Sequence, residues 1–440
     1  MFKNKINERN IEIISFIFGI EIAYYMSGDK INKEWVMENK IKYAFNEIEK
    51  GDNYESCLNI LTENEVVKAK NFHSSFPQYK ETPLAKLDNV AKSIGLAGIF
   101  VKDESYRFGL NAFKVLGGSF AMAKYLASRL GDDISNLDYE KLISKDIKEK
   151  LGDVTFYTAT DGNHGRGVAW TANKLNQKSV VYMPFGSSIA RLENIKKEGA
   201  EASITDMNYD DAVRLAAKNA KETNGVVVQD TAWEGYEEIP AWIMQGYGTM
   251  ALEAIEQLKS YGVDRPTHIF VQAGVGSLAG AVQGVFASIY GKDCPITVIA
   301  ESDLADCLYK SALAKDGKPR FVGGTMQTIM AGLACGEPNT IGWEILRNYS
   351  TAFLSCPDWS AANGMRILGN PLDGDERVKS GESGAVTMGV LYEIMTNDEY
   401  KELRDKLKLN KDSKVLLFST EGDTDPKKYR DIVWFGECTK

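Results

Sequence analysis

The chain has few cysteines for its length and no pattern that would tie them together. Six cysteines are scattered through 440 residues, and no two of them form a C-x-x-C pair. The sequence therefore predicts neither a disulfide framework nor a metal site. We expect reduced thiols in a cytoplasmic protein. A bridge between Cys307 and Cys335 stays open, because sequence does not show the geometry that a bridge needs.

Excess positive charge and long apolar runs are also missing. The chain carries 52 Lys and Arg against 61 Asp and Glu, a formal net charge of -9. Nucleic acid is therefore not expected as a partner, since phosphate binding needs clustered basic residues.

The apolar stretch 11–26 contains Glu12 and Glu21 and is shorter than the roughly 20 residues of a membrane span. No membrane segment or signal peptide is predicted, and we expect this stretch to pack as a helix, a strand or a dimer contact.

The order of apolar and helical patterns indicates an α/β fold. Short apolar runs alternate with helical patterns of ten to fifteen residues along most of the chain. The predicted strands are 99–102, 154–159, 179–183, 202–205, 225–229, 267–272, 296–300 and 414–418. This alternation predicts a mostly parallel, open sheet with helices on both faces. Ligands then bind beyond the carboxyl ends of the strands.

The first part of the chain has mainly helical spacing. Residues 1–70 are predicted to form a helical extension, and the charged segment 33–50 fits a helix within it. The same spacing recurs at Leu84, Leu87, Val90 and Ala91. A long helix is expected to open just after Asn111.

Lys114 is the first candidate for chemistry. A lysine at the start of a helix is ordinarily a surface residue. Here Phe113 and Val115 flank it, and Gly117 and Gly118 follow and permit close backbone approach. A lysine in an apolar pocket at a helix N-terminus has a lowered pKa, which makes its neutral amine available for a Schiff base.

A polar loop between a predicted strand and a predicted helix is the second candidate. It contains Thr160, Asp161, Gly162 and Asn163, and a helix is expected to begin near His164. The helix dipole and free backbone N–H groups favour an anion there. The alternative is a simple helix cap, which would not require a carboxylate, a carboxamide and an imidazole within four positions. We therefore expect Asp161 to His164 to bind an amino-acid substrate.

A glycine-rich loop, QAGVGSLAG, directly follows the predicted strand 267–272. Gly274, Gly276 and Ala279 fit the G-x-G-x-x-G/A dinucleotide fingerprint, and Glu301 closes the next strand at a suitable distance for a ribose hydroxyl. Such a loop cradles a phosphate on other ligands equally well. The motif alone leaves NAD and a phosphorylated cofactor open.

Two further loops lie at a strand end and at a helix start. The segment FSTEGDTD places the hydroxyls of Ser419 and Thr420 at the end of the last predicted strand. The segment GESGAV opens a helix, and its Glu382 either caps that helix or faces the site. Ordinary turns are the alternative, since Ser, Thr and Gly are favoured in them.

In combination these motifs resemble the fold type II (tryptophan synthase β-like) enzymes that use pyridoxal 5'-phosphate (PLP), such as the threonine dehydratases. The similarity is strongest to the diaminopropionate ammonia-lyases and covers roughly residues 80–435. It rests on FGLNAFKVLGGSFA, TDGNHGRGVAW, DMNYDDAVRLA, VVQDTAWEGY, IMQGYGT, TIMAGLACGEPN, GWEILRN, GESGAV and STEGDTD. Each motif alone is of moderate specificity, whereas so many in order are specific.

The resemblance implies a cofactor site. Lys114 forms a Schiff base with PLP, Asn163 lies beside the cofactor ring, and either Ser419 or Thr420 contacts the pyridine nitrogen. The implied phosphate cradle is Gly274, Val275, Gly276, Ser277 and Leu278. The resemblance also implies two α/β lobes with the cofactor between them. We expect a small lobe at 112–230 and a large lobe at 1–111 and 231–440, with 1–70 as its N-terminal extension.

The implied reaction is the α,β-elimination of ammonia from 2,3-diaminopropionate, after which released aminoacrylate hydrolyses to pyruvate and a second ammonia. Lys114 can take the α-proton on one face and Asp161 on the other, where threonine dehydratases have a serine. This implies turnover of both D and L isomers. The leaving amine needs a proton, and the candidate donors are Asp161, Lys114, the cofactor phosphate, Asp230 and Glu234.

The partners implied are an amino-acid substrate and a second copy of the chain in a homodimer. Three alternatives to the ammonia-lyase stay open at this point, one of which is a protein of the PLP fold that has no activity and acts as a sensor or scaffold. A serine or threonine dehydratase would use the same chemistry, and an NAD-dependent dehydrogenase would rest on the glycine fingerprint alone.

Overall fold

The computed structural model describes residues 39–160 and 162–440. Asp161 and the segment 1–38, which includes the apolar stretch 11–26, lie outside the described residues. Residues 41–439 form one unit, and the sheets, helices and site below belong to it.

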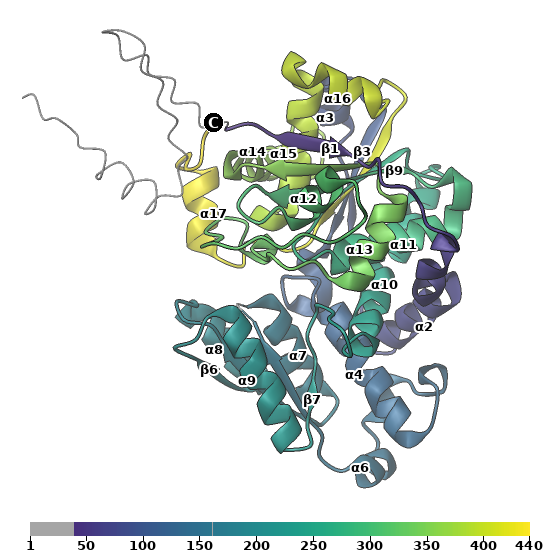
Figure 1. Ribbon diagram of the computed structural model, residues 1–440, viewed down its shortest axis with the longest axis vertical. Helices are drawn as coiled ribbons and strands as arrows, with labels where there is room; N and C mark the ends of the chain where they lie inside the picture. The colour runs from purple at the N-terminus through teal and green to yellow at the C-terminus, as the bar shows by residue number, and fades with distance from the viewer. Residues whose placement is uncertain (1–38, 161) are drawn as a thin grey trace, which may run out of the picture. The chain divides into compact units, whose positions relative to one another are not determined.

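The larger sheet contains seven strands of the described chain, in the order β1-β10-β9-β8-β11-β3-β2 (Figure 1). These strands are β1 (Lys42–Phe45), β2 (Leu84–Lys86), β3 (Gly98–Asp103), β8 (His268–Gln272), β9 (Ile296–Ser302), β10 (Ala352–Cys356) and β11 (Lys414–Ser419). The five inner strands run parallel, and β1 and β2 pair antiparallel at the two edges. The inner strands are almost wholly buried, as expected for a parallel sheet covered on both faces.

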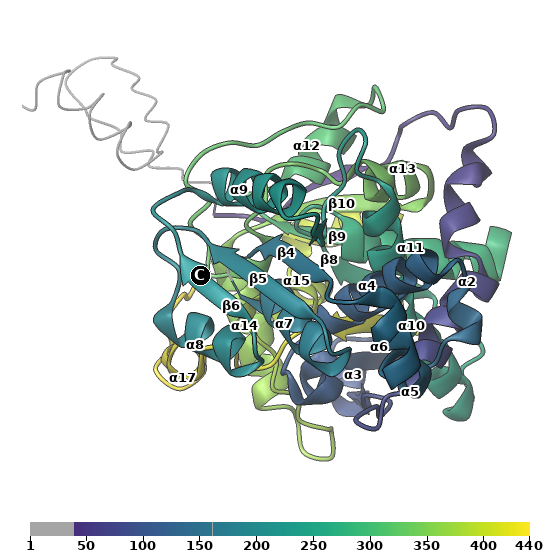
Figure 2. The ribbon, with the colours of Figure 1, turned by 90° about the horizontal axis from the view of Figure 1, so that it is seen from below.

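The smaller sheet has the order β6-β5-β4-β7 and is parallel throughout. Its strands are β4 (Thr155–Ala159), β5 (Lys178–Met183), β6 (Glu201–Ile204) and β7 (Val226–Val227). The helices between them are α7 (Asn163–Lys174), α8 (Ile189–Lys197) and α9 (Tyr209–Glu222). Apolar residues of α7 and α8 pack on one face and those of α9 on the other (Figure 2). All four strands lie within the range 112–230 predicted for the small lobe, whose boundaries stay a prediction.

Helices cover both faces of the larger sheet, and two apolar clusters fill the space between. One cluster joins the sheet to α4, α10 and α11, and the other joins it to α14 and α15. The α-helices other than α7, α8 and α9, including the five just named, are α2 (Glu63–Ser74), α3 (Asp88–Ser93), α4 (Val115–Leu130), α5 (Tyr139–Leu142), α6 (Lys145–Leu151), α10 (Glu238–Ser260), α11 (Ser277–Tyr290), α12 (Cys307–Ala314), α13 (Thr340–Tyr349), α14 (Asp358–Gly369), α15 (Glu382–Thr396), α16 (Lys401–Lys406) and α17 (Pro426–Val433). Short 3-10 segments are η1 (Tyr54–Leu61), η2 (Glu104–Gly109), η3 (Ile134–Asn136), η4 (Gly291–Asp293), η5 (Ala331–Leu333) and η6 (Asp398–Tyr400).

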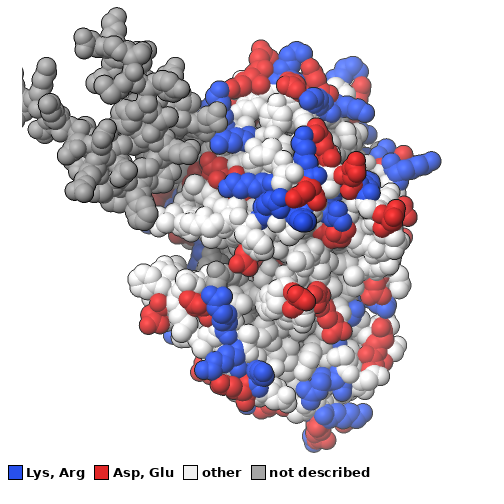
Figure 3. Space-filling model, in the orientation of Figure 1, with Lys and Arg blue, Asp and Glu red and all other residues white. Residues whose placement is uncertain are grey.

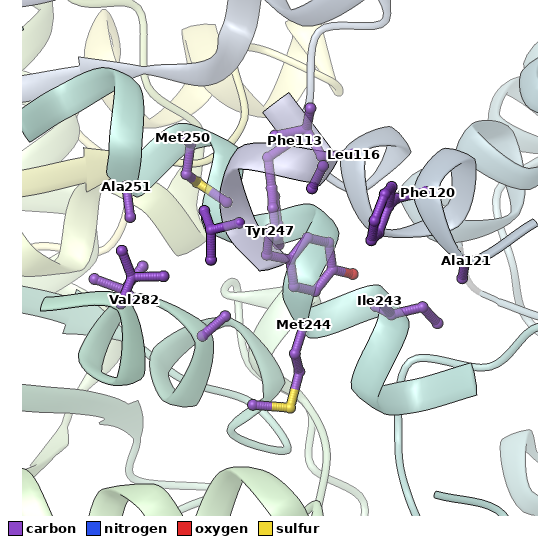
Figure 4. Close-up of a cluster of buried hydrophobic side chains, with 14 of the residues drawn as sticks. Phe113, Leu116, Phe120, Ala121, Ile243, Met244, Tyr247, Met250, Ala251 and Val282 are labelled. Atoms are coloured by element: carbon purple, nitrogen blue, oxygen red, sulfur yellow. The ribbon is translucent and has the colours of Figure 1, made fainter. Parts of the chain in front are cut away.

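Helices α4 and α10 cross in direct backbone contact. A Cβ atom on Gly246 would lie 2.3 Å from the Leu116 carbonyl oxygen, and one on Gly117 would lie 2.5 Å from the Tyr247 ring. Both positions therefore require glycine. The Tyr247 ring lies 4.8 Å from the ring of Phe113, centroid to centroid (Figure 4). This contact fixes the first turn of α4 and the residue that precedes it, Lys114.

Four buried charges at the end of β3 form what we call the paired cluster, namely Lys102, Glu104, Arg107 and Glu253. Their side chains are fully buried. Arg107 donates to Glu104 and to Glu253 at 2.8 Å each, and the Lys102 ammonium lies 2.6 Å from Glu253. Two positive and two negative charges cancel, and each has a partner of opposite sign. Such a network is tolerated in the interior only when it is complete.

Two helical predictions near the N-terminus were wrong. The helix predicted over 33–50 is replaced, in its described part, by the edge strand β1, in which Ala44 is buried against β10. The helical spacing from Leu84 begins instead with the short strand β2, and α3 starts only at Asp88. In both cases pairing with an existing sheet edge overrides a weak helical pattern. Helix α4 also begins later than expected, at Val115, so that Lys114 is its N-cap.

The other predicted strands are present, although the one expected at 225–229 is only the two-residue β7. None of the helices within residues 39–160 and 162–440 is long and apolar enough to cross a membrane. Acidic and basic residues are interspersed on the face seen in Figure 3.

Candidate active site

Lys114 and Asp230 form an ion pair. Lys114 caps α4, and its Nζ donates to Oδ2 of Asp230, which lies just beyond β7. Burial alone would raise the pKa of Asp230, but the Lys114 ammonium and the His164 ring outweigh it and hold this pKa far below its usual range. Asp230 is thus a permanent negative charge beside the lysine amine. The apolar pocket predicted for Lys114 therefore also contains a carboxylate.

His164 connects this pair to the start of α7. Its ring is buried, and Nε2 lies 2.8 Å from the Val228 carbonyl oxygen, which can only accept. Nε2 therefore carries a proton, while Nδ1 lies 3.9 Å from Oδ2 of Asp230. Burial lowers the pKa of His164. The imidazole accordingly anchors the segment 228–230 to the helix N-terminus.

The start of α7 presents free backbone donors, as the sequence predicted. Its N-cap, Gly162, has no side chain to occupy them. Gly162 itself donates to the Thr160 hydroxyl at 3.0 Å, which closes the turn. A helix start of this kind is suited to an anion such as a substrate carboxylate. Asp161, predicted in this loop, lies outside the described residues.

Asn163 makes a contact that sequence reasoning missed. Its Nδ2 donates to Oε2 of Glu421 at 2.6 Å, across 258 positions of the chain. Glu421 lies in the segment that follows β11. This segment pairs with the residues before Lys114. Phe113 donates to the Thr420 carbonyl at 3.0 Å, and Ala112 forms a bridge with Glu421. The last strand therefore brings the lysine segment and the Asn163 loop together.

The glycine-rich loop lies beside the same ion pair. Gly276 is the N-cap of α11 and has φ +98°, a left-handed conformation that favours glycine. Ser277 and Gly276 are buried, while Gly274, Val275 and Leu278 are half-buried. The Ser277 hydroxyl donates to the Asp230 carbonyl at 2.6 Å. This bond joins the predicted phosphate cradle to the partner of Lys114.

Both hydroxyl candidates at the end of β11 are buried. Ser419 is still paired within the sheet, opposite Asp103 of β3, and its hydroxyl has no hydrogen-bond partner among the described residues. Thr420 lies one residue beyond the sheet, and its hydroxyl accepts from Gln272 at 2.8 Å. One lone pair of the Thr420 hydroxyl is therefore engaged, and its proton has no acceptor among the described residues.

A cavity of about 340 Å³ opens next to this site and is lined by residues that follow β5 of the smaller sheet and β11 of the larger one. Glu382 and Glu421 lie in its wall, together with Arg191. A Cβ on Gly162 would lie 3.1 Å from Arg191, so the cavity adjoins the α7 loop. Burial and the Glu421 carboxylate raise the pKa of Glu382 to about 7. Glu382 was predicted either to cap α15 or to face the site, and it faces this cavity.

Glu301, the residue on which the dinucleotide interpretation depended, has another role. It is fully buried and accepts from the backbone N–H of Leu308 at 2.8 Å and of Tyr309 at 2.6 Å. It thereby satisfies the first turn of α12, whose free donors need such a partner. Its carboxylate is not available to a ribose hydroxyl.

The cysteines do not contribute to this site as a bridge. All six are free thiols, and Cys307 lies 3.8 Å from the carbonyl oxygen of Cys335. Burial raises the pKa of Cys307. Within residues 39–160 and 162–440, no group of three His, Cys, Asp or Glu side chains is arranged to hold a metal ion.

The donors present fit a pyridoxal phosphate. An uncapped helix start behind Gly276 suits the phosphate, the Lys114 amine suits the aldehyde, and the free proton of Thr420 suits a ring nitrogen. The predicted residues Lys114, Asn163, His164, Ser277 and Thr420 thus converge on one place. Asp230 could have been recognised from the sequence as a site residue by its position just after a parallel strand, at the carboxyl edge where ligands bind.

Comparison with known proteins agrees with this geometry. The family model for "Pyridoxal-phosphate dependent enzyme" matches residues 76–421. The chain is 52% identical over 401 residues to the diaminopropionate ammonia-lyase of Salmonella typhimurium, covering 91% of this chain and 99% of that protein. It is also 52% identical over 378 residues to the Escherichia coli K12 enzyme of the same name.

Solved structures of the Escherichia coli diaminopropionate ammonia-lyase have the same fold. The complex with D-serine superposes with a TM-score of 0.83 at 49% identity, covering 91% of this chain and 98% of that one. A second structure, in complex with an aminoacrylate-PLP azomethine reaction intermediate, superposes with a TM-score of 0.81 at 48% identity.

Proposed function

Since the chain belongs to the pyridoxal-phosphate dependent enzymes, and within them to the diaminopropionate ammonia-lyases, we propose that it eliminates ammonia from 2,3-diaminopropionate. The products are pyruvate and two molecules of ammonia, formed through aminoacrylate. One observation of the structure carries the proposal: the Lys114–Asp230 pair is joined to the glycine cradle by the Ser277 hydroxyl.

The residues that would hold the cofactor come from three elements. The loop from Gly274 to Leu278 would bind its phosphate at the start of α11, and Lys114 would carry it covalently. Bound pyridoxal phosphate supplies an electron sink that acidifies the α-hydrogen of an amino acid. We assign the ring nitrogen to Thr420, because this residue lies beyond the strand end and its hydroxyl proton is free. A hydroxyl, unlike a carboxylate, leaves that nitrogen mostly unprotonated and so favours elimination.

Lys114 would take the α-proton on one face of the substrate. The Asp230 carboxylate next to its Nζ stabilises the ammonium that this transfer produces. On the opposite face the sequence offers Asp161, which would allow both D and L isomers to react. The α-carboxylate of either isomer would bind the backbone donors at Gly162, Asn163 and His164, at the start of α7.

The geometry narrows the choice of donor for the leaving amine. Glu234 is exposed, which separates it from the buried pair. Asp230 stays ionised because Lys114 and His164 hold its pKa far below the usual range, so it has no proton to give. The two acidic candidates of the segment 230–234 are therefore set aside.

Two properties of the whole molecule are part of this proposal. We propose a homodimer that works in the cytoplasm, and the six free thiols support a reducing compartment. Sedimentation analysis of the purified holoenzyme would show one species at twice the chain mass. A single species at the chain mass would contradict the dimer, and recovery with a periplasmic or secreted fraction would contradict the compartment.

The decisive experiment is an assay of the protein loaded with pyridoxal phosphate. We expect pyruvate from both D- and L-diaminopropionate, and at least about tenfold slower formation of pyruvate from serine and of 2-oxobutyrate from threonine. The Asp161→Asn variant should lose one isomer and keep the other. Faster turnover of serine or threonine would point to a dehydratase instead. Loss of both isomers in Asp161→Asn would contradict the assignment of one base to each face.

A further inference from the structure

We propose that Glu421 and Glu382 form the subsite that receives the second ammonium group of the substrate, the one on the β-carbon. This inference rests on the proposed function, because the β-ammonium is what distinguishes diaminopropionate from serine and threonine. The two residues are treated below as the carboxylate pair.

Glu421 has a free oxygen at the centre of the site. Its Oε2 accepts from Asn163, but its Oε1 accepts no hydrogen bond from the residues that the structure describes. That oxygen lies 3.9 Å from the Cβ position that Gly332 lacks, and the same position lies 2.9 Å from the Ser383 hydroxyl. The Ser383 hydroxyl is buried and also has no partner among the described residues. The carboxylate oxygen of Glu421 and the buried Ser383 hydroxyl thus both lie close to Gly332.

One loop, at Gly332, lies between the glycine cradle and Glu421. A Cβ on Gly274 would lie 3.3 Å from the Gly332 carbonyl oxygen, so the loop at Gly332 separates the cradle from Glu421 by one layer of backbone. Glu421 is also held from the side of the lysine through its bridge with Ala112. Asn163, at the start of α7, and Ala112, two positions before Lys114, thus both contact Glu421.

Glu382 completes the pair from the cavity wall. No side chain of the described residues donates a hydrogen bond to its carboxylate or forms an ion pair with it. The cavity that Glu382 shares with Glu421 also contains Arg191 and Lys428. Both basic groups lower the pKa of Glu382, yet burial and Glu421 outweigh them and raise it to about 7. Two neighbouring carboxylates in a buried place repel each other, and a cation between them removes that repulsion.

An ammonium group is the ligand that this arrangement fits. It presents three donors, and the pair offers acceptors that no other described group uses. The carboxylates would also keep the β-amine protonated. When the Cβ–N bond breaks, its electron pair goes to nitrogen and the ammonium leaves as neutral ammonia. The pair therefore supplies the protonated leaving group for which neither Asp230 nor Glu234 is suited.

The test compares Glu421→Gln and Glu382→Gln with the matched control Asp423→Asn, all as holoenzymes. Gln keeps the shape of Glu and removes the charge. Asp423 is two positions from Glu421 and pairs with Lys379 outside the cavity. Two quantities are measured: KM and kcat for diaminopropionate, and the Kd for serine, obtained by titrating the cofactor absorbance. Serine has a neutral group where diaminopropionate has the β-ammonium.

We expect Glu421→Gln to raise KM for diaminopropionate by about 10- to 100-fold, the range for loss of a hydrogen bond to a charged group. The Kd for serine should change by less than about threefold, because no ammonium is lost. Glu382→Gln should act in the same direction above pH 7, and Asp423→Asn should leave both quantities unchanged.

Three outcomes would separate the possible failures. Equal weakening of both ligands in Glu421→Gln would overturn the subsite, because the residue would then only shape the site. An unchanged KM for diaminopropionate in both Gln variants would overturn it as well. If the unaltered protein releases no pyruvate from diaminopropionate but binds serine, the proposed function itself fails, and the Gln variants are not needed to see it.

Discussion

The molecule contains two groups of buried charge that are built in opposite ways. In the paired cluster, Glu253 accepts from Arg107, and its other contacts are Lys102, the Tyr79 hydroxyl and the Thr82 backbone N–H. Among the described residues of the site, one oxygen of Glu421 has no hydrogen-bond partner and Glu382 forms no ion pair. A saturated network leaves nothing for a ligand to bind, whereas an unsaturated one is costly until a ligand arrives. The comparison separates charges that hold the fold from charges that act on substrate.

The strongest way to sharpen this contrast is to remove a charge from the site. Lys114→Ala should lower kcat for diaminopropionate by at least about 10³-fold, because it removes both the covalent attachment and a base. The free energy of unfolding should fall less than in Glu253→Gln, since 23% of the Lys114 side chain is exposed whereas the paired cluster is fully buried. Pyruvate release and denaturant unfolding measure the two effects. A large loss of stability would make Lys114 part of the scaffold.

A change in the paired cluster should have the opposite result, a loss of stability without a loss of activity. Glu253→Gln should lower the free energy of unfolding by about 3–5 kcal/mol, because Lys102 loses its carboxylate partner and Glu104 alone cannot compensate two buried positive charges. The folded fraction should keep its kcat. The control is Glu256→Gln, which removes an exposed partner of Lys70 and should cost about 0.5 kcal/mol or less. Similar losses for the two variants would contradict the assigned role.

The same cluster predicts how stability depends on pH. Burial would raise the pKa of Glu253, but Arg107 and Lys102 outweigh it and lower this pKa to about 2, from 4.5. A lowered pKa stabilises the fold above the unfolded value and loses that contribution as pH falls. We therefore expect the contribution of Glu253 to disappear between about pH 4.5 and pH 2. Parallel unfolding curves for Glu253→Gln and the unaltered protein across this range would refute it.

A smaller loss of activity is expected when Asp230, the ion-pair partner of Lys114, is changed. Asp230→Asn should lower kcat by about 10²-fold and move the pH–rate profile to lower pH, because the amide no longer favours the protonated Lys114. Tyr247→Phe is the matched control, since it removes only the 3.4 Å contact of the tyrosine hydroxyl with the same carboxylate. It should cost less than about tenfold. An unshifted profile in Asp230→Asn would remove Asp230 from the proton transfer.

The smallest effect is expected from the titration of Glu382. Its raised pKa of about 7 means that it is neutral below pH 7 and negative above it. The groups that face it are Glu421, Asp425, Arg191 and Lys428. KM for diaminopropionate should therefore fall by about three- to fivefold between pH 6 and pH 8. Glu382→Gln should abolish that fall, and an identical pH dependence in both proteins would mean that Glu382 does not reach the substrate.

Local pattern predicted most of the architecture. The inner strands are continuous apolar runs, so strands such as β8 and β11 are visible without any knowledge of their neighbours. The edge strands β1 and β2 were missed because their pairing depends on β10 and β3, far away in the chain. A short strand at a sheet edge contains too few residues to show a period.

The site residues likewise fall into two groups, those that a local motif predicts and those that only the packing brings together. Lys114 and the loop at Gly276 were recognised because each belongs to a local motif. The bond between Asn163 and Glu421 spans 258 positions, and no spacing in the sequence indicates it. The Glu382 carboxylate was noticed, but its direction depends on how α15 lies against the segment after β11. Contacts of this kind follow from packing, which a linear pattern does not contain.

The position of β11 has a consequence for the newly made protein. It is the last strand of the described chain, yet it lies in the middle of the larger sheet, between β8 and β3. While the ribosome is still adding residues before Lys414, both neighbours have an unpaired edge, which is a template for wrong association. The segment from Thr420 to Gly422, which forms backbone hydrogen bonds with the residues just before Lys114, is translated later still. A nascent chain therefore cannot load its cofactor early, and the enzyme becomes competent only when nearly all of it has been synthesised.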